Sequence, residues 1–307
     1  RLAEIRGSGG LPDLNLYAQV TPSAGAAGRA GLLAVVKALL ADPAVETAFL
    51  EPVAVPAALG FDAFAERGAA AGAVAGAGAS AGGFAAASAS AGAGDLPTAE
   101  PAVTPDFTSL QGYLGAAPAG VNALAVAGNP GGTGAGVRVV DVEGAWLWSH
   151  EDLPVPVLTL GAQIDDLGWR NHGTAVLGEI AGVANGLGVR GIAPGCQVGA
   201  SSIGSQSTAD AISNATAQLA AGDVILIELH APGPNATGSG QVGYVPMEFW
   251  QDNFDAIRLA TAAGLIVCEA AGNGQEDLDD PVYLGLFDRA VRDSGAIMCG
   301  ASSGSSL

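Results

Sequence analysis

The chain has 307 residues, of which 49% are hydrophobic and 13% are charged, with a mean hydropathy of +0.38. This apolar content excludes a generally disordered chain and allows two domains, or one large domain with an appendage. The 11 basic and 30 acidic residues give a net charge of −19, which offers no electrostatic surface for nucleic acid or anionic lipid. No apolar run reaches the roughly 20 residues of a bilayer span, so no membrane partner is expected.

The three cysteines, Cys196, Cys268 and Cys299, are too few and too spread out for a disulfide framework or a zinc site. Each lies in an apolar stretch of sequence, which predicts a small buried side chain. The three histidines also lack metal-binding spacing.

Residues 1–60 predict a small α/β segment. Residues 14–20 and 44–55 have strand character, and Arg29–Leu40 has an apolar helix pattern that Asp42-Pro43 ends. A unit of this size is only marginally stable alone and is expected to pack against something larger. Residues 61–104 predict a linker, because nearly every residue from Gly68 to Gly94 is Gly, Ala or Ser, and proteases are expected to cut there first.

Residues 105–307 alternate between strands and helices. Strands are expected at 137–142, 197–203, 224–229, 265–269 and 296–300, and helices from about His172 onward, at 207–221 and at 247–263. Near-continuous apolar strands separated by helices predict an α/β fold with a parallel sheet covered by helices on both faces. Functional groups in such folds lie beyond the carboxyl ends of the strands.

Three polar residues satisfy that rule. Asp141 ends the first of these strands, although a cap or turn residue is an equally good interpretation. His172 starts a helix, and the small Gly173 and Thr174 beside it would let another backbone approach the ring. Asn273 follows a buried strand in an Asn-Gly sequence that is, in isolation, simply a turn.

In this order, the segments GVRVVDVEG, NHGTAVLGEIAG, GVRGIAPGCQV and IVCEAAGNG resemble the subtilisin-like serine peptidases, over about residues 106–300. The resemblance implies a subtilisin-like fold and hydrolysis of a protein or peptide substrate without a catalytic cofactor. It implies that His172 is the general base, that Asp141 orients its imidazole, and that the Asn273 amide donates to the oxyanion. Members of this family are mostly secreted, so an extracellular location is expected.

The family's nucleophile lies in a Gly-Thr-Ser run at the start of a helix, and this sequence has no such run. Ser302, Ser303, Ser305 and Ser306 lie in a Gly/Ser-rich tail that is interpreted as loop. We therefore expect the serine on a missing C-terminal fragment, the 307-residue chain alone to be inactive, and apolar surface to be exposed at strand 296–300. A catalytically inactive subtilisin-like binding module is the alternative. A dinucleotide-binding protein is disfavoured because Gly132–Gly136 precedes a strand.

Three further features have open interpretations. Residues 1–60 loosely resemble the family's inhibitory propeptides, with a mature enzyme starting near Thr104 to Gln111, and an unrelated domain is the other interpretation. Glu228 and His230 either tune the first specificity pocket or lie at its rim. The acidic residues of 165–166 and 277–280 either hold structural calcium or are solvated surface, and no ligand spacing defines a calcium site.

Overall fold

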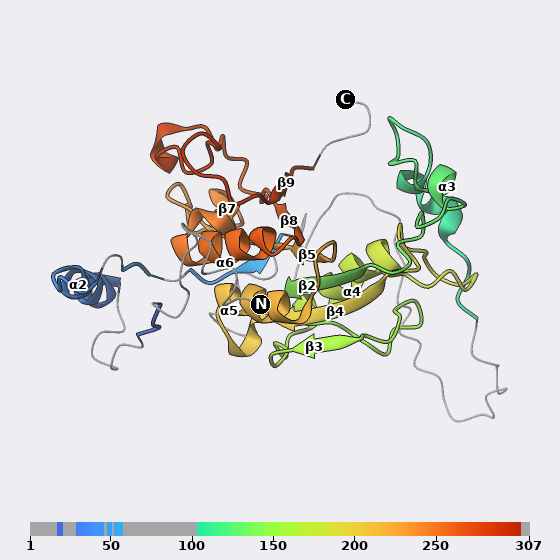
Figure 1. Cartoon of the computed structure of the whole chain (residues 1–307), viewed down its shortest axis with the longest axis horizontal. Coiled ribbons are helices and arrows are strands. Elements are labelled where there is room, and N and C mark those ends of the chain that lie inside the picture. Colours follow the sequence, from blue (N-terminus) through green and yellow to red (C-terminus); the bar gives the residue numbers. More distant parts are fainter. Residues whose placement is uncertain (1–16, 21–28, 46–47, 51, 58–102, 302–307) are drawn as a thin grey trace, which may run out of the picture.

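The computed structural model describes residues 17–20, 29–45, 48–50, 52–57 and 103–301 (Figure 1). Its main sheet has six strands, all parallel, in the order β3-β4-β2-β5-β8-β9. The strands are β2 (Arg138–Glu143), β3 (Leu158–Leu160), β4 (Gln197–Ser202), β5 (Val224–Ile227), β8 (Ile266–Ala270) and β9 (Ile297–Cys299). The predicted α/β fold with a parallel sheet is confirmed. Most of the predicted linker lies outside the described residues.

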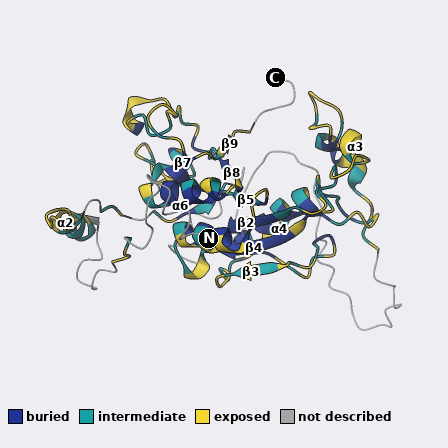
Figure 2. Cartoon of the chain, in the orientation of Figure 1, coloured by how far each residue is buried: buried dark blue, intermediate teal, exposed yellow. Residues whose placement is uncertain are grey.

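Helices cover both faces of the central strands (Figures 1 and 2). They are α4 (Leu167–Ala181) on one face, and α5 (Thr208–Gln218) and α6 (Gln251–Ala262) on the other. Alternation along β2 sends Val139 into the cluster that includes α4, and Val140 and Val142 into the cluster that includes α5 and α6. Asp141 and Glu143 have the parity of Val139, so β2 presents two carboxylates on the α4 side.

A second sheet was not expected from the sequence. It is antiparallel and has the order β1-β6-β7, from β1 (Val55–Pro56), β6 (Leu229–Pro232) and β7 (Tyr244–Pro246). Val55 lies opposite His230, and the backbone N–H of Ala57 donates to the carbonyl of Glu228 at 3.0 Å. The N-terminal segment therefore adds a strand to the edge of β6, next to the carboxyl end of β5.

Local sequence signals explain most of the helix limits. Helix α2 (Arg29–Leu40) has the predicted bounds. Helix α4 begins before His172 because the Asp166 carboxylate caps it, accepting from two backbone N–H groups of the first turn. Ser207 caps α5 as expected, through a bond from the Asp210 N–H. The remaining short elements are α3 (Ala123–Val126) and the 3-10 turns Thr108–Leu110, Gly112–Leu114, Ile203–Ser205, Met247–Phe249 and Pro281–Tyr283.

Two expected strands are wrong over their described parts. Residues 17–20 have no regular structure, and of the stretch 44–55 only Val55 is in a strand. The Tyr17 hydroxyl donates to a carboxylate oxygen of Asp255 on α6 at 2.6 Å. Tyr17 and β1 thus contact residues 103–301, and the described residues of the N-terminal segment do not form a strand–helix–strand unit.

The α4-side face of the sheet is covered over β2 and β4 but open over β8 and β9. The strand registers place Ile266 of β8 and Ile297 of β9 on this face. Their side chains are 45% and 54% exposed. The expected apolar exposure at strand 296–300 is therefore present. No helix among the described residues is long and apolar enough to cross a membrane.

Candidate active site

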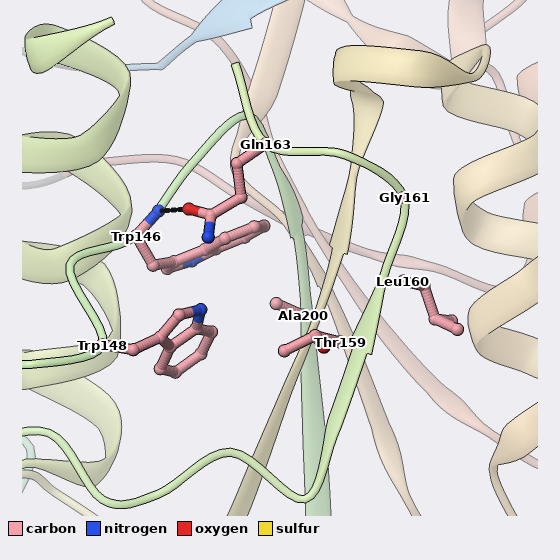
Figure 3. Close-up of a pocket in the computed structure, with 7 residues that line it drawn as sticks. All are labelled: Trp146, Trp148, Thr159, Leu160, Gly161, Gln163 and Ala200. Atoms are coloured by element: carbon pink, nitrogen blue, oxygen red, sulfur yellow. Dashed lines mark hydrogen bonds between the residues drawn. The ribbon is translucent and has the colours of Figure 1, made fainter. Parts of the chain in front are cut away.

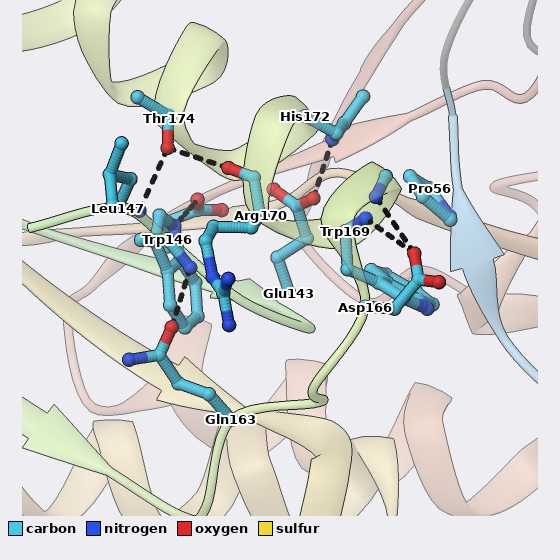
Figure 4. A network of polar contacts seen from close by, with 12 residues as sticks. Pro56, Glu143, Trp146, Leu147, Gln163, Asp166, Trp169, Arg170, His172 and Thr174 are labelled. Atoms are coloured by element: carbon cyan, nitrogen blue, oxygen red, sulfur yellow. Dashed lines mark hydrogen bonds and ion pairs between the residues drawn. The ribbon is translucent and has the colours of Figure 1, made fainter. Parts of the chain in front are cut away.

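A histidine and a glutamate form the centre of the site, at the carboxyl end of β2 (Figure 4). The Nδ1 atom of His172, on α4, lies 2.5 Å from Oε1 of Glu143, the last residue of β2. Glu143 is fully buried, and the His172 side chain is 9% exposed. An ionised carboxylate only accepts hydrogen bonds, so the proton is assigned to Nδ1 and the lone pair to Nε2.

Asp141 does not make the contact that the sequence predicted. Its Oδ2 atom accepts a hydrogen bond from Nε1 of Trp146 at 2.8 Å, and the expected Asp141–His172 hydrogen bond is wrong. The reason is that β2 continues past Asp141, so Glu143 stands on the same face and closer to α4. The sequence signal was present, because Glu143 follows Asp141 within the same motif.

Burial controls the charge of the site. It lowers the pKa of His172, and electrostatic interactions with nearby carboxyl groups, among them those of Glu228 and Glu179, oppose it only in part. Burial likewise raises the pKa of Glu143 and of Glu228. A lowered pKa keeps the imidazole neutral at neutral pH, which is the form that can accept a proton.

Gly173 lets the β2–α4 contact form, as its position beside His172 suggested. A Cβ atom at Gly173 would lie 2.4 Å from the carbonyl oxygen of Ala145 and 2.8 Å from the Trp146 ring. The Thr174 hydroxyl lies in the same contact, accepting from the N–H of Leu147 at 2.8 Å (Figure 4). The loop after β2 is therefore fixed against the helix that carries His172.

We expect Gly173→Ala to destabilise the protein by about 1–3 kcal/mol, because the added methyl group collides with backbone and a buried ring. Gly178→Ala on the same helix is the matched control. A Cβ there meets only Val189, at 3.8 Å, so the better helix propensity of alanine should leave stability unchanged or slightly raised. Urea unfolding followed by circular dichroism measures both. Equal effects of the two substitutions would contradict the packing argument.

Asn273 forms its hydrogen bonds with Gln241 and His230, and not with His172. Its side-chain amide donates to Oε1 of Gln241 at 3.0 Å, and its backbone N–H donates to Nδ1 of His230 at 3.1 Å. Gln241 in turn donates to the carbonyl of Pro56 on β1 at 3.1 Å. The described structure thus brings His172 together with Glu143, and it links Asn273 to the N-terminal strand through Gln241.

Glu228 and His230 follow the end of β5, and they differ in burial and in the residues on which they act. His230 is fully buried and supports the turn that carries Asn273. Glu228 is partly exposed, and its charge acts on His172. Neither Gln241 nor the supporting role of His230 was foreseen, because both depend on contacts between segments far apart in sequence.

The acidic clusters have local roles that do not fit a metal site. Asp166 caps α4, and Asp165 forms an ion pair with Arg170 at 3.1 Å. Asp277 and Asp280 each accept a backbone N–H within their own turns. No group of three or more His, Cys, Asp or Glu side chains among the described residues could hold a metal ion.

The cysteines match their expected burial only in part. Cys196 is buried, Cys268 is half-buried and Cys299 is exposed, so the expectation of a buried side chain is wrong for Cys299. Cys299 is exposed because it lies on the open α4-side face of the edge strand β9.

A small cavity lies between the indoles of the loop after β2 and the strands β3 and β4 (Figure 3). It has a volume of about 260 Å³, and its lining includes Trp146, Trp148 and Gln163. The two indoles stack with their centroids 5.8 Å apart, and the Gln163 side chain accepts from the backbone N–H of Trp146 at 2.6 Å. This aromatic pair fixes the loop after β2, and Trp146 of the same loop donates a hydrogen bond to Asp141.

The site as a whole is that of a parallel α/β protein with a buried histidine–carboxylate pair at the carboxyl edge of its sheet. The sequence model of the subtilase family matches residues 159–296 of this chain. The resemblance suggested by the motifs is confirmed. The matched stretch contains His172 and Asn273, whereas Asp141 and Glu143 precede it.

Among solved structures, the chain is similar to fervidolysin from Fervidobacterium pennivorans, described as a keratinolytic enzyme related to subtilisin. The identity is 20% and the TM-score 0.33, over 46% of this chain and 22% of fervidolysin. The chain thus corresponds to less than a quarter of the length of that structure. No curated protein matches the chain.

Proposed function

We propose that this chain is part of a serine endopeptidase of the subtilisin type. The observation that carries the proposal is the buried His172–Glu143 hydrogen bond at the edge of the stretch that matches the subtilase family. His172 would take the proton of a serine hydroxyl on Nε2 and later give it to the leaving amine. Glu143 would hold the Nδ1–H tautomer and stabilise the imidazolium that forms, which is the role that the sequence assigned to Asp141.

The Asn273 amide would donate to the oxyanion of the tetrahedral intermediate. Its present acceptor is Gln241, which also donates to the Pro56 carbonyl of β1. In this proposal Gln241 must release Asn273 when β1 leaves, so the N-terminal segment and the oxyanion donor are coupled.

The substrate would be a protein or peptide bound in extended form along the edge of β6. The support for this is β1 itself, which already occupies that edge through the pairing of Val55 with His230 and the bond from Ala57 to Glu228. Ala54 is buried at 6% exposure, and a cavity of about 360 Å³ is lined by residues 52–56 together with side chains such as Ile164 and Trp169. A strand in the substrate position would make residues 1–60 an inhibitory propeptide, and the protein a zymogen.

The inhibitory role predicts the effect of one substitution. Ala57→Pro removes the N–H that donates to the Glu228 carbonyl, and should weaken the hold of the segment on β6. Ala57→Ser keeps that donor and is the matched control. With a fluorogenic peptide substrate and the chain extended to its natural stop codon, the proline variant should become active sooner than the serine variant. Equal activation times would count against inhibition by this strand.

We propose that the nucleophile lies on a C-terminal fragment outside these 307 residues. Within the described residues, no serine hydroxyl is hydrogen-bonded to His172, and Ser302 to Ser306 lie outside them. The open face over Ile266 and Ile297 lies on the same side of the sheet as α4 and would receive the helix that carries the serine. The 307-residue chain alone would then be inactive.

The test is labelling by a serine-directed fluorophosphonate probe. The chain extended to its natural stop codon should be labelled, the 307-residue chain should not, and His172→Ala should abolish labelling of the longer protein. Labelling of the short chain between Ser302 and Ser306 would overturn the assignment of the serine. A longer protein that folds but remains unlabelled would favour the second candidate, a catalytically inactive subtilisin-like binding module.

Three further assignments belong to the same proposal. Secretion follows from the family resemblance and would be checked by fractionating the culture of the producing cells. Structural calcium is suggested by the family resemblance alone, and the acidic clusters 165–166 and 277–280 give it no support. The start of the mature enzyme between Thr104 and Gln111 would be read directly by N-terminal sequencing.

A further inference from the structure

Two carboxylates lie side by side in the interior next to His172, although one is sufficient to orient the ring. Asp141 and Glu143 are two residues apart on β2, point to the same face, and are both 0% exposed. The central strand β2 is paired on both sides, with β4 and β5. Among the described residues, no lysine or arginine forms an ion pair with either carboxylate.

Each carboxylate has one satisfied oxygen and one orphan. Asp141 Oδ2 accepts from Trp146, and Glu143 Oε1 is bonded to His172. Asp141 Oδ1 and Glu143 Oε2 are buried without a hydrogen-bond partner. Two ionised groups in this setting would repel each other and leave two buried acceptors unpaired, which destabilises the doubly ionised state.

A single proton shared by the two carboxyl groups removes both the charge repulsion and the unpaired acceptors. If Asp141 carries it on Oδ1, that O–H can donate to Glu143 Oε2, and all four oxygens then have partners. We propose that Asp141 is a neutral carboxylic acid that shares this proton with Glu143 and positions Glu143 as the ionised partner of His172. Asp141 is therefore a positioning residue, acting through Glu143.

The surroundings favour the proton on Asp141. Burial and the charge of Glu143 raise the pKa of Asp141 well above its usual range. Burial and Glu228 also raise the pKa of Glu143, but a hydrogen bond from Asp141 opposes that rise. Glu143 has two donors available, from His172 and Asp141, which stabilise its ionised form.

The inference deepens the proposed peptidase function, but it is tested without peptidase activity. The first measurement is the titration of His172 by NMR in the full 307-residue chain, with the signal assigned from His172→Gln. The other titratable groups acting on His172 or close to it are Glu228 after β5, Glu179 on α4 and His230 on β6, and they are unchanged in every variant compared.

Asp141→Asn is the critical variant, because its amide mimics a neutral acid. The amide oxygen can accept from Trp146 and the amide N–H can donate to Glu143. We expect the pKa of His172 and its Nδ1–H signal to be nearly unchanged in Asp141→Asn. In Glu143→Gln, the Nδ1–H signal should be lost and the pKa should fall by about one unit or more. An equal fall in both variants would overturn the proposal, since it would mean that Asp141 is ionised.

A second measurement covers the case in which Asp141→Asn does not fold. The infrared spectrum of the unsubstituted protein at neutral pH should contain the carbonyl stretch of a buried protonated carboxylic acid, and residue-specific isotope labelling should assign it to Asp141. Absence of that band, or its assignment to Glu143, overturns the proposal. If the band is absent or belongs to Glu143, but the longer protein is still labelled by the fluorophosphonate probe, then only the shared-proton proposal fails. The peptidase assignment then stands.

Discussion

Replacing Glu143 by glutamine is expected to lower kcat by about 10⁴-fold in the chain extended to its natural stop codon. The amide is the same size as the carboxylate, but it can donate to Nδ1 and so favour the wrong tautomer of His172, and it cannot stabilise the imidazolium. Because the lost interaction forms in the transition state, KM should change little. Steady-state kinetics with a fluorogenic peptide measures both constants.

Glu179→Gln is the matched control for this experiment. Glu179 lies on the exposed side of α4 and acts on His172 by charge alone, so removing the same charge there should change kcat by less than about tenfold, because exposed charges are screened. Similar losses at both positions would show that net charge, and not the hydrogen bond to Glu143, supports the reaction. A normal kcat in Glu143→Gln would return the orienting role to Asp141.

Five of the six strands of the main sheet could be predicted from the sequence because each has a local signature, whereas the short strand β3 (Leu158–Leu160) was not predicted. The β-branched run of β2, the Ser207 cap of α5 and the apolar strand β8 all depend on neighbouring residues. The small sheet could not be predicted, because β1 is only Val55–Pro56 and exists through pairing with a distant edge. Register between distant strands leaves no periodic trace in so short a segment.

The sequence identified the motifs that contain Glu143 and His172, but it did not predict the hydrogen bond between these two residues. The sequence marked the block containing Asp141 and Glu143, and the side chain that reaches α4 depends on where β2 ends and how far each side chain extends. Family resemblance favoured the aspartate, whereas alternation along the strand gives the two carboxylates the same face. The bond from Asn273 to Gln241 depends on the fold of the intervening segment, which carries no sequence signal.

His230 should make the protein less stable as the pH falls from 6.5 to 4. Burial, followed by the charge of His172, lowers its pKa to about 4 in the folded state. The unfolded chain binds a proton at this residue near pH 6.5, so between these values it binds more protons than the folded protein and stability rises with pH. The contribution is complete above pH 6.5, and about 3 kcal/mol of it is lost by pH 4.

The comparison with His230→Asn isolates this contribution. An asparagine oxygen can still accept from the backbone N–H of Asn273, and it does not titrate. The buried carboxylates Asp141, Glu143 and Glu269 have raised pKa values and make stability fall as pH rises, but they are present in both proteins and cancel in the difference. Urea unfolding at several pH values between 4 and 7 should therefore give a difference in unfolding free energy, native minus variant, that increases with pH. If this difference does not change with pH, the pKa of His230 is not lowered in the folded protein. The turn that carries Asn273 would then not depend on a neutral His230 ring.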